Sequence, residues 1–281
     1  MVRVDIICPL YNAEKYIEKL HLSLQMQENV FIDNIYYILT ESKDRTEEYL
    51  KTYGCNYSII KKEEFSHSLV REKVAFQSQA DILVFITQDV LIEKKNWLYE
   101  LVKDIDGTVV AAYSRQLPKT NGIEKYIREK NYPASSFCVS KNDIDSFGLR
   151  TFFFSDASSA IKRDIFVKLN GYDGKNLPIS EDMYIAYKII MAGYKIKYCA
   201  TSEVIHSHDF TLKEIYKRYK LTGKFFKENA YLDKFGTNKS GGSLAKYVFK
   251  RALQEKNIKV LLEFPFNMTV RFLGMKVGKW I

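Results

Sequence analysis

Three short polar segments contain the residue types that metal-assisted group transfer requires. Glu181 and Asp182 are adjacent carboxylates at the expected start of a helix. His206 and His208 form an HxH pair, and Asp89 ends an apolar run that is typical of a strand. A carboxylate can act as a base, while oxygen and imidazole ligands can hold a divalent cation. The three segments together predict a transfer site more sharply than any one of them alone.

Each segment also has a simpler interpretation that the sequence leaves open. Asp89 is equally typical of a residue that caps the following segment. Glu181 and Asp182 could offset a helix dipole, and the two histidines could be exposed to solvent. A zinc site normally takes three or four His, Cys or carboxylate ligands, and the chain offers no obvious set. We therefore expect Mn²⁺ or Mg²⁺, held by Asp89 with His206, His208 or both.

The first 115 residues alternate between strand and helix patterns. Strands are expected at residues 2–8, 35–39, 57–60, 82–87 and 109–113, and helices at 13–26, 46–53, 69–78 and 96–103. This alternation predicts a parallel sheet built from βαβ units, with the ligand site beyond the carboxyl ends of the strands. Residues 9–11, 40–44 and 88–89 all follow expected strands, so we expect them to meet at one edge of the sheet.

The second half of the chain is less regular. Residues 117–149 are polar, and we expect them to form a partly helical insertion on the acceptor side. A helix is expected at 182–191 and a strand at 195–199, and the apolar pair at 204–205 leads into the HxH segment. The two candidate catalytic segments therefore belong to a second set of elements that must fold back onto the first.

Positive charge is concentrated at the C-terminal end. The chain has a net charge of +9, but residues 212–281 carry sixteen Lys/Arg against five Asp/Glu, which is +11. The preceding residues are therefore near neutral, at −2. The basic residues alternate with bulky apolar ones at helical spacing, and Gly241-Gly242 is a hinge candidate. This pattern predicts a basic amphipathic helical extension that binds an anionic membrane surface and no nucleic acid, although a charged helix packed on the domain would look the same.

Some classes of protein are disfavoured by what the sequence lacks. No GxGxxG follows the first strand and no GxxxxGK[ST] occurs, which argues against a dinucleotide oxidoreductase and a P-loop NTPase. The four cysteines are scattered without a CxxC pair, and Cys8 and Cys199 lie in apolar, strand-like runs, which is typical of buried thiols in a reducing compartment. No stretch approaches the roughly 20 apolar residues that cross a bilayer. We therefore expect a cytoplasmic protein, peripheral on the inner face of the cytoplasmic membrane.

Taken in order along the chain, several segments resemble the family 2 glycosyltransferases of GT-A fold, and within them the bacterial rhamnosyltransferases. The matching segments are DIICPLYN at 5–12, SKDRT at 42–46, FSH at 65–67 with Arg71, QDV at 88–90, FSDASSAI at 154–161, SED at 180–182 and HSHDFTL at 206–212. The resemblance covers residues 1 to about 220, and the last two segments are the most specific. Two departures stand out: Thr40-Glu41 replaces the usual aspartate near the base and ribose, and Ser68 replaces a glycine.

The resemblance implies an α/β fold in which a Rossmann-like mixed sheet is flanked by helices. It also implies an inverting glycosyltransferase that moves L-rhamnose from dTDP-L-rhamnose onto a glycan acceptor in cell-surface polysaccharide biosynthesis, with a UDP-hexose as the alternative donor. Asp182 is the expected base, with Glu181 as second choice, and Asp89, His206 and His208 are the expected metal ligands. The residues expected to bind the nucleotide-sugar are Pro9, Tyr11, Thr40, Glu41, Asp44, His67, Arg71, Gln88, Asp89 and Ser155.

The expected organisation has a GT-A catalytic domain at residues 1–211 and the basic helical extension at residues 212–281. Within the first, residues 1–115 would bind the nucleotide-sugar and residues 116–211 would carry the acceptor side and the base. The acceptor is expected to be a glycan, carried by a polyprenyl lipid at the inner membrane face. Two other classes stay open: a metal-dependent hydrolase, such as a deacetylase or phosphoesterase, and a non-catalytic basic scaffold.

Overall fold

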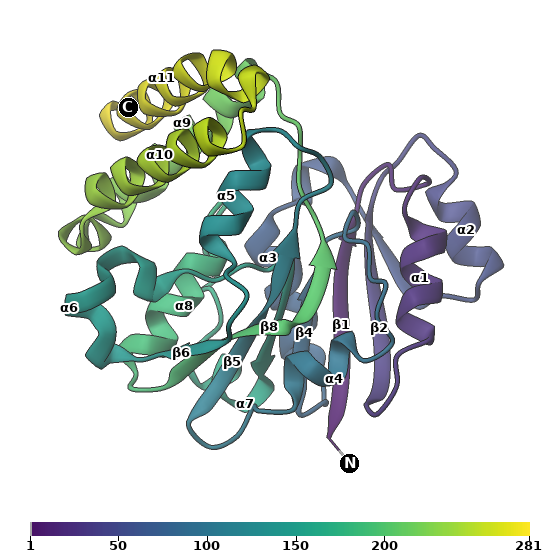
Figure 1. Ribbon diagram of the computed structural model, residues 1–281. Coiled ribbons are helices and arrows are strands. Elements are labelled where there is room, and N and C mark those ends of the chain that lie inside the picture. The colour runs from purple at the N-terminus through teal and green to yellow at the C-terminus, as the bar shows by residue number, and fades with distance from the viewer. Residues whose placement is uncertain (1) are drawn as a thin grey trace.

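The computed structural model describes residues 2–281, except the side chains of residues 237–240. Its centre is an eight-stranded sheet with the order β3-β2-β1-β4-β7-β5-β8-β6 (Figure 1). The strands are β1 (Arg3–Leu10), β2 (Phe31–Thr40), β3 (Tyr57–Ile60), β4 (Ile82–Ile86), β5 (Val109–Leu117), β6 (Phe137–Val139), β7 (Ser158–Lys162) and β8 (Lys195–Ile205). The α-helices are α1 (Ile17–Gln25), α2 (Thr46–Thr52), α3 (His67–Gln77), α4 (Trp97–Val102), α5 (Ile123–Asn131), α6 (Ile144–Phe147), α7 (Arg163–Lys168), α8 (Glu181–Met191), α9 (Leu212–Glu228), α10 (Thr237–Gln254) and α11 (Ile258–Trp280). The expected mixed sheet flanked by helices is confirmed.

Six strands of this sheet run in one direction and two run against them. The strands β1 to β4 are parallel to one another, as are β5 and β8. The strand β7 lies between β4 and β5 and pairs antiparallel with both, and β6 pairs antiparallel with β8. The parallel sheet expected for the first 115 residues is therefore confirmed, and the second half adds the antiparallel strands. The carboxyl ends of six strands meet at one edge, where ligands of such sheets bind.

Two apolar clusters fill the two faces of the sheet. In β1, Val4, Ile6 and Cys8 point into one cluster and Ile7 points into the other, because successive side chains of a strand alternate. Side chains of α1 and α4 complete the first cluster, and those of α3, α7 and α8 complete the second. Burial on both faces explains why the central strands are continuous apolar runs in the sequence.

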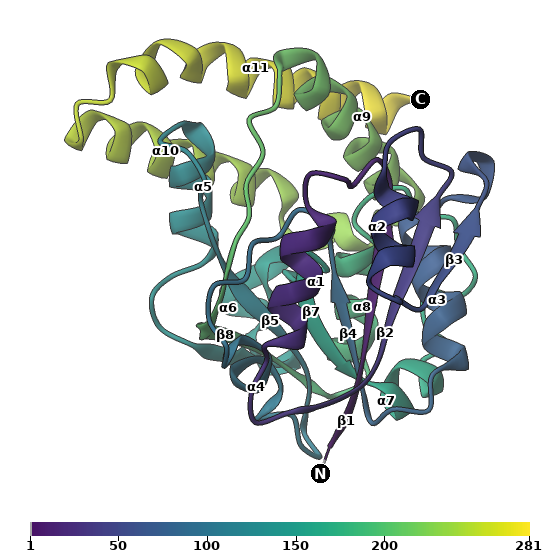
Figure 2. The same cartoon turned by 90° about the vertical axis from the view of Figure 1, so that its right-hand side faces the viewer.

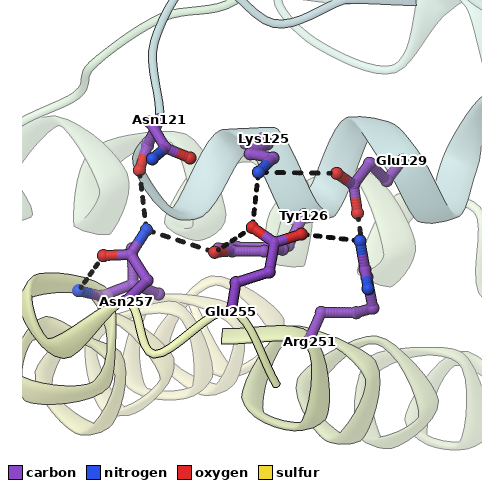
Figure 3. Close-up of polar contacts among 8 residues, drawn as sticks. Asn121, Lys125, Tyr126, Glu129, Arg251, Glu255 and Asn257 are labelled. Carbon is purple, nitrogen blue, oxygen red and sulfur yellow. Dashed lines mark hydrogen bonds and ion pairs between the residues drawn. The ribbon is translucent and has the colours of Figure 1, made fainter. Parts of the chain in front are cut away.

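The helices α9, α10 and α11 form a layer on the side of the strand ends (Figures 1 and 2), and Phe225 and Phe226 of α9 join the second apolar cluster. The α10–α11 pair rests on α5 through an apolar cluster that includes Tyr126 and Val248. Figure 3 shows the polar contacts beside it: Glu255 accepts hydrogen bonds from Lys125 at 2.5 Å and from the Tyr126 hydroxyl at 3.0 Å. The basic extension is thus helical and docked. Among the described residues, none of these helices is long and apolar enough to span a bilayer.

The helices α9 and α11 approach each other at backbone distance through glycines. A Cβ atom on Gly278 would overlap the carbonyl oxygen of Lys220, and one on Gly223 would overlap that of Met275. Only glycine permits such an approach. The Gly241-Gly242 pair, in contrast, lies inside the continuous helix α10, so the predicted hinge is wrong.

We expect Gly278→Ala to lower the stability of the protein. The added methyl group must push α11 away from α9, and overpacking of this kind costs about 1–3 kcal/mol. A drop in melting temperature, followed by circular dichroism, is the measurement. Gly241→Ala is the matched control, because a Cβ atom there meets nothing within 4 Å and alanine is the better helix former. Equal melting temperatures for the two variants would contradict the close packing.

Candidate active site

Asp89, His206 and His208 lie together at the edge where the parallel strands end. The Asp89 Oδ2 atom is 3.5 Å from Nε2 of His206 and 3.4 Å from Nε2 of His208. One ligand atom from each residue falls within 4.8 Å of the others. Leu91 and Ile205 hold the two segments together, since each donates a backbone hydrogen bond to the other at 3.0 and 2.9 Å. The three residues predicted from the sequence to be metal ligands therefore lie close together in the structure.

This cluster combines one carboxylate with two neutral imidazoles. Burial on its own would raise the pKa of Asp89, but the adjacent His206, His208 and Lys119 outweigh it and hold that pKa below its ordinary value. Burial lowers the pKa of His208 to about 4 and lowers that of His206 as well. Near neutral pH the carboxylate is ionised and both imidazoles keep a lone pair, which is the protonation state that metal ligands need.

Gln116 sets the orientation and the tautomer of His206. The Nδ1 atom of His206 lies 2.9 Å from Gln116 Oε1, which also accepts a hydrogen bond from Arg128. The amide nitrogen of Gln116 donates to Ser155 Oγ at 2.8 Å. Because an amide oxygen can only accept, Nδ1 carries the proton and Nε2 carries the lone pair. That Nε2 atom is buried and has no hydrogen-bond partner among the described residues, so the cluster fits a divalent cation.

Gln116 and Arg128 are not among the site residues predicted from the sequence. Gln116 is 1% exposed and lies in β5, beyond residue 113 where that strand was expected to end. A polar side chain at a buried strand position is the signal that was available. The capping alternative for Asp89 is not seen either, since α4 begins only at Trp97 and Asn96 is its N-cap.

Asp182 lies in the first turn of α8, close to other carboxylates. Its Oδ1 atom accepts a hydrogen bond from the backbone N–H of Met183 at 2.7 Å. Burial, together with the charges of Glu181 and Asp156, raises the pKa of Asp182 well above its ordinary value, despite the opposing charge of Arg71. A carboxyl group with raised proton affinity is suited to act as a general base near neutral pH.

Glu181 is tied into a buried ion pair. Arg71 Nη1 donates to Glu181 Oε1 at 2.8 Å and to the carbonyl oxygen of His67 at 3.1 Å. Arg71 is only 1% exposed, so its guanidinium is enclosed by these partners. A phosphate contact by Arg71 stays a prediction, and this geometry does not favour it. Because of this ion pair, Glu181 is less available than Asp182 to act as a general base.

Two of the predicted nucleotide-binding side chains hold loops in place. Tyr11 donates its backbone N–H to Gln88 Oε1 at 2.7 Å, and Gln88 Nε2 donates back to the Tyr11 carbonyl at 3.0 Å. Asp44 accepts hydrogen bonds from the Thr46 hydroxyl at 2.6 Å and from the Glu14 backbone at 3.0 Å. Gln88 and Asp44 therefore shape the loops after β1 and β2, and direct contact with a nucleotide stays a prediction for both.

The other predicted binding residues differ in how accessible they are. Pro9 and Thr40 are buried at the ends of β1 and β2, and Thr40 Oγ1 has no hydrogen-bond partner in the part of the chain that the structure describes. Glu41 is exposed directly after β2. His67 is half-buried, and burial lowers its pKa to about 3, so its imidazole is neutral. Ser155 Oγ accepts a hydrogen bond from the side-chain amide of Gln116 in β5.

Tyr132 is connected to the metal-ligand cluster through Arg128. The Arg128 guanidinium lies 5.7 Å from the centre of the Tyr132 ring and donates to Gln116, which in turn bonds to His206. Burial raises the pKa of Tyr132, the charge of Arg128 lowers it, and the charge of Asp182 raises it. The charge of Asp182 therefore acts on the same polar network that orients His206.

The model of Glycosyl transferase family 2 matches residues 5–169, which include the first strands and the Asp89 segment. The chain belongs to this glycosyltransferase family. A family relative, the O-antigen chain rhamnosyltransferase WbaN of Salmonella anatum, is 35% identical over 99% of this chain and 90% of its own. The O-antigen chain rhamnosyltransferase RfbN of Salmonella typhimurium is 32% identical over the same shares of the two chains.

Two solved structures of glycosyltransferases share the fold. The mannosyltransferase PcManGT of Pyrobaculum calidifontis, in complex with GDP-Man and Mn²⁺, superposes with a TM-score of 0.66 at 15% identity, over 99% of this chain and 87% of that one. TarS of S. aureus, in complex with UDP-GlcNAc, gives a TM-score of 0.56 at 17% identity, over 95% and 79%. The expected GT-A fold is confirmed. The family 2 protein is a glycosyltransferase of polysaccharide biosynthesis, and the hydrolase and scaffold alternatives are set aside.

Proposed function

We propose that this family 2 glycosyltransferase is an inverting rhamnosyltransferase that uses dTDP-L-rhamnose and a lipid-linked glycan acceptor. Both curated relatives carry the name of O-antigen chain rhamnosyltransferases, which supports rhamnose as the sugar. The observation that carries the proposal is the Asp89–His206–His208 cluster at the edge where the parallel strands end. A UDP-hexose is the alternative donor.

Asp89, His206 and His208 would hold the divalent cation, for which we propose Mn²⁺ or Mg²⁺. A cation bound there would supply positive charge that stabilises the leaving diphosphate. The carboxylate of Asp89 faces the unpartnered Nε2 atom of His206 at 3.5 Å, which supports the assignment. Tyr11, Thr40 and Glu41, at the ends of β1 and β2, would line the nucleotide.

Asp182 would take the proton of an acceptor hydroxyl as that oxygen attacks the anomeric carbon from the face opposite the diphosphate. A single displacement of this kind inverts the configuration of the sugar. Glu181, held by Arg71, would keep a negative charge beside Asp182 and so keep the pKa of the base raised. A positioned base of this kind contributes about 10²–10⁴-fold to the rate.

Calorimetric titration with dTDP-, UDP- and GDP-sugars, with and without Mn²⁺, tests the donor. We expect dTDP-L-rhamnose to bind most tightly and its affinity to depend on the cation. Tighter binding of a UDP-hexose would favour the alternative donor. If no nucleotide-sugar bound under any condition, the proposed function would be overturned.

We also propose that the outer face of α11 contacts an anionic membrane. Five of its large apolar side chains are 60% or more exposed and recur on one side of the helix: Ile258, Leu262, Phe266, Phe272 and Trp280. The extension also carries a net charge of +11, and basic residues near an anionic surface contribute about 1 kcal/mol each. Because α11 lies on the side of the strand ends (Figures 1 and 2), a membrane-bound enzyme would turn its site towards a lipid-linked acceptor.

Replacing Leu262, Phe266 and Trp280 together with serine tests this contact. Each side chain is exposed in the free protein, so the fold should survive while membrane affinity falls at least about tenfold. Co-sedimentation with vesicles that contain anionic lipids is the measurement. Phe31→Ser is the matched control, because Phe31 is 47% exposed at the amino end of β2. Unchanged co-sedimentation of the triple variant would count against α11 as the membrane face.

A further inference from the structure

The guanidinium of Arg218, in the helical layer, lies near the metal-ligand cluster. Arg218 lies in the second turn of α9, and its guanidinium lies 4.7 Å from the centre of the Phe210 ring. The Phe210 ring stacks on His208, with 4.8 Å between ring centres and 26° between planes. His208 Nε2 is in turn 3.4 Å from Asp89. The stack therefore places a guanidinium one aromatic ring away from the cluster.

Arg218 lacks a partner for its charge. In the part of the chain that the structure describes, its guanidinium forms no ion pair or hydrogen bond, whereas Lys224 on the same helix pairs with Glu228 at 3.6 Å. Arg218 is also exposed to solvent, so its guanidinium is accessible to a ligand.

In the proposed reaction, positive charge near the metal-ligand cluster would stabilise the leaving group. The bond between the anomeric carbon and the diphosphate oxygen breaks, its electron pair stays on that oxygen, and the acceptor proton goes to Asp182. The leaving diphosphate therefore gains one negative charge, beside the carboxylate of Asp89. Two nearby cations are already engaged, since Arg71 is bound to Glu181 and Arg128 donates to an amide oxygen.

We propose that Arg218 binds the sugar-linked phosphate of the donor and stabilises the diphosphate as it leaves, with Phe210 as the platform that positions its guanidinium. A planar guanidinium can donate two parallel hydrogen bonds to phosphate oxygens, and an exposed, unpaired one gives up no existing ion pair to do so. This inference rests on the proposed function, because it assigns a residue to the diphosphate of that donor.

Titration of the purified full-length protein with dTDP and dTMP, with UDP and UMP, and with GDP and GMP, all in the presence of Mn²⁺, tests the assignment. Arg218→Ala should weaken binding of the tightest diphosphate by about 10- to 100-fold and leave the matching monophosphate within about twofold. Arg218→Lys should recover part of the loss, because it keeps the charge without the planar fork. Lys217→Ala, which removes an exposed charge from the same helix turn, is the control and should bind both nucleotides as the parent does.

The possible outcomes separate this inference from the function on which it rests. Unchanged diphosphate affinity in Arg218→Ala, or an equal loss for monophosphate and diphosphate, would overturn the role of Arg218 and leave the proposed function standing. A loss of the same size in Lys217→Ala would also overturn it, because the effect would then be one of overall charge. Absence of nucleoside diphosphate binding by the parent protein would overturn the proposed function and this inference together.

Discussion

We expect Asp182→Asn to abolish measurable transfer and to leave donor binding within about twofold of the parent. Asparagine has the shape of aspartate and can still accept the hydrogen bond from the Met183 backbone, so the start of α8 should keep its geometry. What the variant loses is the ability to take a proton, and loss of a positioned base costs about 10²–10⁴-fold in rate. Single-turnover transfer and calorimetric donor titration measure the two effects separately.

Glu181→Gln distinguishes the two adjacent carboxylates. It breaks the buried ion pair with Arg71, so we expect a lower melting temperature together with partial activity. Near-normal turnover in Asp182→Asn, combined with complete loss in a folded Glu181→Gln, would transfer the role of base to Glu181.

The assignment of the base also fixes the direction of the pH dependence. A base must be deprotonated to act, and burial with the charges of Glu181 and Asp156 raises the pKa of Asp182. The rate should therefore fall as pH falls, and this fall should lie at a higher pH than an ordinary aspartate would give. Asp156→Asn removes one of the repelling charges, so in that variant the acidic limb of kcat/KM should move to lower pH.

The second large effect is expected at the metal-ligand cluster. Asp89→Asn removes its anionic ligand and should lower both Mn²⁺ affinity and turnover by at least about a hundredfold, because a divalent cation prefers charged oxygen. His206→Ala should lower Mn²⁺ affinity and turnover more than His208→Ala does. His206 is buried and its ring is held by Gln116, whereas His208 is more exposed. Mn²⁺ titration with and without nucleoside diphosphate is the measurement.

Asp209→Asn is the control for these variants. Asp209 follows His208 directly, but its side chain accepts a hydrogen bond from Thr120 at 2.9 Å. It should retain Mn²⁺ affinity and turnover. Full Mn²⁺-dependent activity in Asp89→Asn would remove the cluster from the mechanism.

The sequence predicts well those elements whose signal is local. The strand expected at residues 57–60 is found as β3, Tyr57–Ile60, and the buried runs at β1 and β4 are continuous enough to be recognised at once. The prediction for β5 stops four residues short of Leu117, because Arg115 and Gln116 are polar and give no strand signal. Their place in the sheet follows from pairing with β8, which no local pattern reveals.

The strand β7 was missed for a similar reason. Its small residues, at 158–160, give no strand signal of their own, and only the pairing with β4 and β5 turns them into a central strand. The hinge prediction at Gly241-Gly242 failed because the surrounding residues and the contact with α5 are sufficient to maintain a helix.

The candidate site was predictable where function requires unusual residue types. A carboxylate at a strand end and an HxH pair are conspicuous in the sequence, and the structure brings Asp89, His206 and His208 together. The residues that orient or accompany them are not conspicuous. Gln116 and Arg218 are ordinary polar residues whose partners lie far away in the chain, so only the folded geometry indicates what they contact.

The direction of β7 has a consequence for how this enzyme can change its specificity. Because β5 and β7 are antiparallel neighbours, β5 ends at Leu117 and β7 begins at Ser158 on the same edge of the sheet. Residues 118–157 thus run from one strand end to the other beside the site, and on the way they add only the short edge strand β6, which pairs with β8. Evolution can lengthen, shorten or exchange such a stretch without shifting the register of any central strand. A chimera that receives this stretch from a relative would keep its donor half and acquire a new wall around the acceptor.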